Sequence, residues 1–283
     1  MKKAIALLPL ALISVLLAAQ APFPSKNEIS QFSSSTTCVV LEDDSFSPFN
    51  VFIKKAMKDF WTITPFEFID QDEFETRMKK PDYSFIMLTE TTYDKDKSGS
   101  AFNFINLVQG KYVNRISALP EICAVPLSSS GEDDLDYGFK LGAVLLFMQK
   151  HAGLIMEDPS KTGRRYLKFY NENIPDIAGR IILVKQEDLS PAIGDMDKIK
   201  AIYSGKVEIV TEEEIVNAIE ERSPSTVILH KVGPAGEVPG GYCFKMLIGT
   251  DDANMYYYNT HTIDNDNPDG LLPADLKRLA RFD

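Results

Sequence analysis

The chain is poor in the residues that nucleic-acid-binding proteins use. Its 283 residues include 30 Lys and Arg against 41 Asp and Glu, which gives a formal net charge of −11 at pH 7. Binding to a phosphate backbone depends on clustered Lys and Arg. The main basic cluster, residues 161–170, is interpreted as one solvated face of a helix. We therefore expect no nucleic-acid partner.

Residues and motifs that carry common catalytic chemistry are also scarce. The three histidines, His151, His230 and His261, lack a second histidine at metal-ligand spacing, and GxSxG, P-loop and HExxH motifs are absent. The glycine-rich segment 233–241 joins two predicted strands and does not open a helix, so it is interpreted as a hairpin connection and not a phosphate cradle. These absences favour a protein that is not an enzyme. A hydrolase on an unfamiliar scaffold stays open, because convergent sites need no motif.

Cysteine is too rare for a disulfide framework. Cys38, Cys123 and Cys243 form an odd set, and each lies in an apolar run. We expect all three to be small buried hydrophobic residues. One structural disulfide is the alternative. A catalytic thiol would need a nearby histidine or positive field, and the sequence suggests none.

One long apolar run is present, and it lies at the N-terminus. Lys2 and Lys3 precede it and small residues end it, which is the secretory signal pattern. A membrane-anchoring helix would need about 20 apolar residues, and Pro9 interrupts this run. We expect residues 1–21 to be a signal peptide, with cleavage preferred after Ala19.

Removal of this leader would leave a more acidic chain. It takes away two lysines, so 28 basic residues face 41 acidic ones and the net charge becomes −13. No cysteine near the cleavage site could carry a lipid. We expect an exported protein in the periplasm or outside the cell, soluble or peripherally associated with the envelope, without a transmembrane segment.

An acidic phrase occurs twice, as FEFIDQDEFE from residue 66 and VEIVTEEEIV from residue 207. Each is interpreted as a strand followed by a capped helix, with Asp70 and Glu73 in the first copy and Thr211 and Glu214 in the second. Carboxylates in a first helical turn are also favoured by the helix dipole. Capping explains the acidic residues in both copies, so we prefer it to acid–base catalysis.

The surrounding pattern repeats as well. Each copy begins with an apolar first strand (36–41 and 180–184), which is followed by a helix-start pair, Ser47-Pro48 or Ser190-Pro191. After the acidic phrase, each copy has a third strand (83–90 and 225–232) and then two strand-like runs (within 101–117 and 241–263). A helix closes each copy (135–154 and 272–282). The unit is therefore β-α-β-α-β-β-β-α. Strand-helix-strand units predict parallel pairing, and the later hairpin adds antiparallel strands.

We predict an α/β fold of two tandem related domains, each with a mixed sheet. The first covers residues 22–155 and the second residues 156–283, because the pattern breaks between 155 and 176. A single domain with one continuous sheet is the alternative.

The order of elements in both halves, with the phrases FEFIDQDEFE and VEIVTEEEIV, resembles the envelope-protein domain of the TolB amino-terminal region and of CsgG-like curli-secretion proteins. The resemblance includes no invariant signature. It implies a binding or assembly role in the cell envelope with a protein partner. The propeller of TolB and the lipid anchor of the secretion channel have no counterpart here.

Two acidic loops were weighed as calcium sites. Residues 94–99 begin like a calcium-binding loop, but the twelfth position is Ile105. The loop 263–271 brings together Asp264, Asp266 and Asp269, which are weak metal candidates. Asx, Pro and Gly also form turns without an ion, so no cofactor is expected, with calcium as the alternative.

The run MYYYNT offers candidate contact residues. Tyr256, Tyr257 and Tyr258 should alternate faces in a strand, and an exposed tyrosine is a common interface residue. Packing under the closing helix is the alternative.

These patterns predict an exported, non-enzymatic binding or scaffold protein of the bacterial cell envelope. The alternatives are a small-ligand-binding protein with its site between the two halves, where pockets are frequent, and the hydrolase named above.

Overall fold

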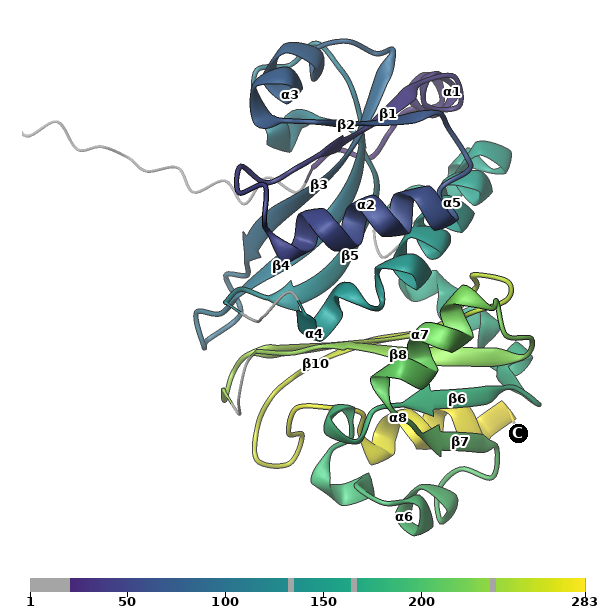
Figure 1. The fold of residues 1–283 in the computed structure, drawn as a ribbon. Helices are drawn as coiled ribbons and strands as arrows, with labels where there is room; N and C mark the ends of the chain where they lie inside the picture. Colours follow the sequence, from purple (N-terminus) through teal and green to yellow (C-terminus); the bar gives the residue numbers. More distant parts are fainter. Residues whose placement is uncertain (1–20, 132–134, 164–166, 235–237, 283) are drawn as a thin grey trace, which may run out of the picture.

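The computed structural model describes residues 21–131, 135–163, 167–234 and 238–282, so nearly all of the predicted signal peptide lies outside it. The first half contains α1 (Lys26–Phe32), β1 (Thr36–Val40), α2 (Pro48–Phe60), β2 (Phe66–Ile69), α3 (Gln71–Arg77), β3 (Tyr83–Thr92), β4 (Ala101–Gln109), β5 (Glu121–Ser129), α4 (Leu135–Gly138) and α5 (Leu141–Glu157). The second half contains β6 (Ile181–Val184), α6 (Met196–Lys200), β7 (Lys206–Ile209), α7 (Glu212–Glu220), β8 (Thr226–Val232), β9 (Tyr242–Gly249), β10 (Met255–Thr262) and α8 (Pro273–Leu279). Short 3₁₀ helices η1 (Ile116–Ala118), η2 (Pro159–Lys161), η3 (Lys168–Ile177), η4 (Gln186–Asp188), η5 (Pro191–Ile193) and η6 (Ala280–Phe282) connect them (Figure 1).

The two halves have the same sheet topology, which confirms the predicted duplication. The strand order is β2-β1-β3-β4-β5 in the first sheet and β7-β6-β8-β9-β10 in the second. In each, the first strand pairs in parallel with the second and third, and the last two strands join antiparallel. The alternative of one continuous sheet is wrong, because the strands form two sheets.

Capping explains the repeated acidic phrase, as predicted. The Thr211 hydroxyl accepts from the amide of Glu214, and the Glu214 carboxylate accepts from the amide of Thr211. Asp70 likewise accepts from the amide of Glu73, at 2.8 Å. The Glu73 carboxylate instead forms an ion pair with the guanidinium of Arg77, 2.9 Å away. The second copy therefore has a complete capping box and the first has half of one.

Three predicted elements differ in the structure. The fifth strand of the first half is Glu121–Ser129, beyond the predicted run 101–117. The predicted helix 135–154 is divided into α4 and α5, and α5 continues two residues past the expected domain boundary. The helix after Ser190-Pro191 is interrupted because Asp195 caps a new helix by accepting from the amide of Lys198.

The elements form five layers. Helix α3 covers the outer face of the first sheet, and α2, α5 and α7 lie between the two sheets. Helices α6 and α8 cover the outer face of the second sheet, and η3 runs along its β10 edge. The central layer and the inner faces of both sheets form one hydrophobic core (Figure 1).

Side chains of both halves interlock at this shared core. The rings of Phe102 and Phe244 pack edge to face with centroids 5.2 Å apart, and Tyr93 packs against Tyr242 at 5.3 Å. The imidazole Nε2 of His230 donates to the carbonyl of Pro126, at 2.9 Å. A ligand site between the halves would require this packed contact to open. Within the described ranges, none of the helices is both long and apolar enough to span a membrane.

Candidate binding site

The two halves each have a topological switch point at the carboxyl edge of the parallel strands. In the first half, α2 leads from β1 to β2 on one face of the sheet, while α3 leads from β2 back past β1 to β3 on the other face. Crossovers that diverge in this way leave a crevice beyond the strand ends, where open α/β sheets bind their ligands.

The first switch point holds a pocket of about 180 Å³ with a mostly apolar lining. It is lined by Val40, Glu42, Phe49, Gln71, Phe74, Met87, Leu88, Thr89 and Ile116. These residues come from the end of β1 and the loop that follows it, the middle of β3, the first turns of α2 and α3, and the start of η1. The pocket is smaller than the roughly 300–1,000 Å³ typical of small-molecule sites. Its size therefore suits a single apolar side chain.

A buried asparagine holds the rim of this pocket in place. Asn50 on α2 donates to the carbonyls of Glu42 and Asp44, and its own Oδ1 accepts from the amide of Glu42 at 3.0 Å. The Ser47 hydroxyl donates to the Glu42 carboxylate. The rim is thus pre-organised, which reduces the entropy that a bound partner would have to offset.

Two large apolar side chains are exposed, one in the pocket lining and one in the loop between β1 and α2 that carries Glu42. Phe46, on the rim loop, is 89% exposed, and Ile116, which lines the pocket, is 49% exposed. Exposed apolar groups beside a pocket, with a polar rim, are typical of protein contact sites.

The second switch point is occupied by paired charges. Lys140, from the first half, lies 3.3 Å from Asp188, and both are buried. Lys231 at the end of β8 lies 2.5 Å from Asp269. Burial alone would lower the pKa of Lys231, but the charges of Asp269 and Asp188 raise it above its ordinary value. The corresponding edge of the second half is therefore occupied by charged side chains, one of which, Lys140, comes from the first half.

The loop that carries Asp269 is docked by its backbone. The amide of Leu271 donates to the carbonyl of Asp188, and the amide of Ser190 donates to that of Leu271. Gly270 has φ of +109°, and a Cβ there would lie 2.8 Å from the Ser190 nitrogen. Glycine is needed here for both reasons.

The structure separates the carboxylates that were weighed as calcium ligands. Asp264 accepts from the amides of Asp266 and Asn267 in a turn, while Asp269 pairs with Lys231. Within the part of the chain that the structure describes, no three His, Cys, Asp or Glu side chains converge as metal ligands. Residues 264–267 have the geometry of the Asx turn that the sequence predicts.

The three cysteines and two of the histidines, His151 and His230, are buried, and their pKa values are shifted away from use as nucleophiles or bases. Burial raises the pKa of Cys38 to about 11 and that of Cys243 to about 12, and it raises that of Cys123 well above its ordinary value. Burial lowers the pKa of His151 to about 4. Burial, followed by the charge of Lys140, lowers that of His230 to about 3. All three thiols are buried, which confirms the prediction, and all three are free, so the alternative disulfide is not formed.

Two of the three candidate tyrosines are buried. Tyr256 and Tyr257 are 2% and 1% exposed, while Tyr258 is partly exposed. A bulge between Met255 and Tyr257 breaks the expected alternation, so Tyr256 and Tyr257 both pack into the outer core of the second half. This burial corrects the expectation of an exposed tyrosine surface for those two residues.

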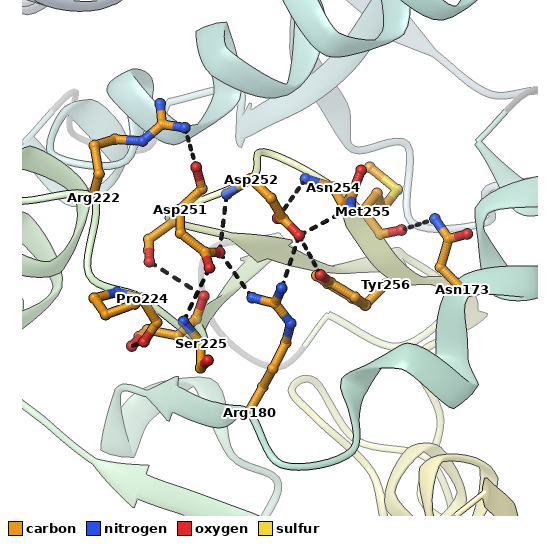
Figure 2. A network of polar contacts seen from close by, with 12 residues as sticks. Asn173, Arg180, Arg222, Pro224, Ser225, Asp251, Asp252, Asn254, Met255 and Tyr256 are labelled. Carbon is orange, nitrogen blue, oxygen red and sulfur yellow. Dashed lines mark hydrogen bonds and ion pairs between the residues drawn. The ribbon is translucent and has the colours of Figure 1, made fainter.

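At the opposite edge of the second sheet, charges form a fully bonded network (Figure 2). Arg180 lies 2.8 Å from both Asp251 and Asp252, and its guanidinium packs over the ring of Tyr256. Asp251 also accepts from the amide of Ser225, and Asp252 from the hydroxyl of Tyr256. These contacts fasten the β9–β10 turn to the amino ends of β6 and β8, so we assign the network a structural role.

No protein-family model matches the chain, and comparisons with curated proteins and with solved structures also find no match.

Sequence reasoning did not identify the pocket residues. Val40, Phe49 and Met87 look like ordinary core positions, because apolar periodicity does not distinguish a filled core from the wall of a pocket. A usable signal was present: the helix starts at Ser47-Pro48 and Asp70 follow two adjacent parallel strands, and this order predicts a crevice at their ends.

Proposed function

We propose that the chain is an exported, non-enzymatic binding or scaffold protein of the bacterial cell envelope, and that it binds a protein partner at the carboxyl edge of its first sheet. The pocket there accepts one apolar side chain of the partner. Phe46 and Ile116 form the surrounding contact.

The observation that carries this proposal is the pre-organised apolar pocket at the first switch point. Its volume of about 180 Å³ suits a side chain better than a free metabolite. The equivalent edge of the second half is closed by ion pairs. The two copies have thus diverged, with one edge suited to binding and the other to stability.

The rest of the molecule is consistent with a scaffold. The halves share one core, so a partner bound to the first half is held at a fixed position relative to the second. The N-terminal signal pattern supports export. The raised thiol and lowered histidine pKa values disfavour these groups as catalysts. The packed contact between the halves weighs against a ligand site there.

The proposal can be tested by affinity capture. Tagged residues 22–283 are incubated with solubilised envelope extract, and retained proteins are identified by mass spectrometry. The variant Phe46→Ser/Ile116→Ser should lose the specific partner, because each change replaces an exposed apolar contact by a polar group.

Phe282→Ser is the matched control. Phe282 is 49% exposed, like Ile116, but it lies at the end of the second half. The account expects Phe282→Ser to retain the partner. Equal retention by the double variant, or equal loss by the control, would show that binding does not involve the first edge.

A further inference from the structure

A second hollow, unrelated to the first edge, lies between β10 and α8. Its volume is about 350 Å³, within the range of small-molecule sites. It is lined by Tyr257, Asn259, Ala274, Asp275, Arg278 and Arg281. The site proposed here is independent of the proposed function above.

Among the described residues that line this hollow, the one carboxylate, Asp275, is already neutralised. Asp275 is 1% exposed, and its Oδ2 accepts from Lys245 at 2.5 Å and from the amide of Leu272 at 2.8 Å. Its Oδ1 accepts from the Tyr257 hydroxyl and from the Asn259 amide group. Lys245 is fully buried. The buried pair therefore forms a neutral floor and contributes no net charge.

Because the Lys245–Asp275 pair is neutral, two arginines supply the net charge of the described residues that line the hollow. Arg278 and Arg281 are three residues apart on α8 and η6, and both line the hollow. Among the described residues, neither has an Asp or Glu oxygen within ion-pair distance. This local charge of +2 stands out in a chain whose formal net charge is −11.

One of these guanidinium groups is already oriented. Arg278 lies over the ring of Tyr257, 5.6 Å from its centroid, and Tyr257 is fixed by its hydrogen bond to Asp275. A stacked guanidinium keeps its N–H donors in one plane, which suits two-point binding of a carboxylate or phosphate. Arg281 is exposed and lines the same hollow.

We propose that this hollow binds a small oxyanion, the carboxylate or phosphate group of a soluble ligand, between Arg278 and Arg281. The two cations supply the recognition, and the neutral Lys245–Asp275 pair holds Tyr257 beneath Arg278. With two charge-assisted contacts and an acidic protein around it, the site should have a Kd of about 1 mM for the bare ion.

The test titrates residues 22–283 with inorganic phosphate and, separately, with succinate. Binding is followed by NMR at the arginine Nε–Hε signals, assigned with the Arg278→Gln and Arg281→Gln variants. Saturable shifts of both arginines are expected. Each single variant should weaken binding at least 10-fold, because one of two charged contacts is lost. Saturation by one ion alone identifies phosphate or carboxylate as the ligand group.

Lys277→Gln is the matched control, since Lys277 is an exposed cation on the same helix. It should change the Kd less than 2-fold. Equal weakening in Lys277→Gln would indicate general surface charge and overturn the site, as would a lack of saturation at about 50 mM of either ion. Arg281 is exposed, so Arg281→Gln keeps the test valid even if Arg278→Gln disturbs folding.

Discussion

Buried neutral histidines are the residues whose ionisation most affects this fold. His230 is 1% exposed, and its Nε2–H donates to Pro126 of the other half. The neutral ring then has Nδ1 as an acceptor, for which the described residues provide no partner. His151 is also 1% exposed, and its Nδ1 lies 2.9 Å from the Tyr170 hydroxyl. Protonating either ring would place a charge in an apolar layer.

Stability should therefore fall as the pH is lowered from about 6.5 to 5. The pKa of His230 is about 3 in the folded chain against an ordinary value of 6.5, so in this window the unfolded chain binds a proton that the native chain does not. Each such histidine contributes a slope of about 1.4 kcal/mol per pH unit. Urea unfolding at several pH values measures this slope. The variant His230→Leu should reduce it by about that amount, and an unchanged slope would refute the assignment.

The sequence identifies some of these residue roles and not others. Burial of Cys38, Cys123 and Cys243 was predictable because each lies in an apolar run. The partner of His230 was not, since Pro126 is 104 residues away in the chain. Residue type and local pattern predict burial, but they do not identify contacts between distant segments.

Gly153 in α5 and Gly270 in the loop after β10 differ in what an added Cβ atom would contact. Gly153 lies inside α5, and a Cβ there would meet nothing within 4 Å. Gly270 has positive φ, and a Cβ there would approach the Ser190 nitrogen and the Asp188 oxygen. The same substitution should therefore have opposite effects at the two positions.

Gly153→Ala should stabilise the chain by roughly 0.5–1 kcal/mol, because alanine loses less entropy in a helix. Gly270→Ala should destabilise it by more than about 1 kcal/mol and release the loop that holds Asp269 against Lys231. Denaturant midpoints measure both effects. Two changes of the same sign would contradict this account of the loop.

The sequence predicts most elements but misses α1 and β5, and it does not predict where helices break. Caps at Asp70 and Thr211 placed α3 and α7 correctly, because capping is a local interaction. Asp195 caps a separate helix shortly after Pro191, and the start signal at Ser190-Pro191 does not reveal this break. The bulge that turns Tyr256 and Tyr257 to one face depends on pairing with β9, which local pattern does not contain.

At the scale of the whole molecule, the two copies use opposite faces to meet. Helix α2 of the first half lies in the central layer, but its counterpart α6 lies on the outside; α3 lies on the outside, but its counterpart α7 lies in the centre. The copies are thus stacked in a head-to-tail manner. The sequence predicts two units but not this contact, because strands that are apolar on both faces do not show which face meets a neighbour.

A shared core predicts that both halves unfold together. Trp61, the single tryptophan, is buried in the first half and reports its unfolding by fluorescence. Leu229→Ala removes a buried side chain in the outer core of the second half and should cost about 2–5 kcal/mol. The urea midpoint reported by Trp61 should fall by the corresponding amount. An unchanged Trp61 transition would show that the halves unfold separately.

The central claim, that the first edge accepts an apolar side chain, is tested most directly by methionine-methyl NMR. Met87 lines that pocket, while Met246 is buried in the second half and serves as the internal control. Residues 22–283 are titrated with N-acetyl-leucine amide, and Met87→Leu assigns the signal. The account predicts saturable shifts of the Met87 methyl, weakened by Ile116→Ser, with Met246 unchanged. A Met87 signal that does not move, or one that moves no more than Met246, would contradict it.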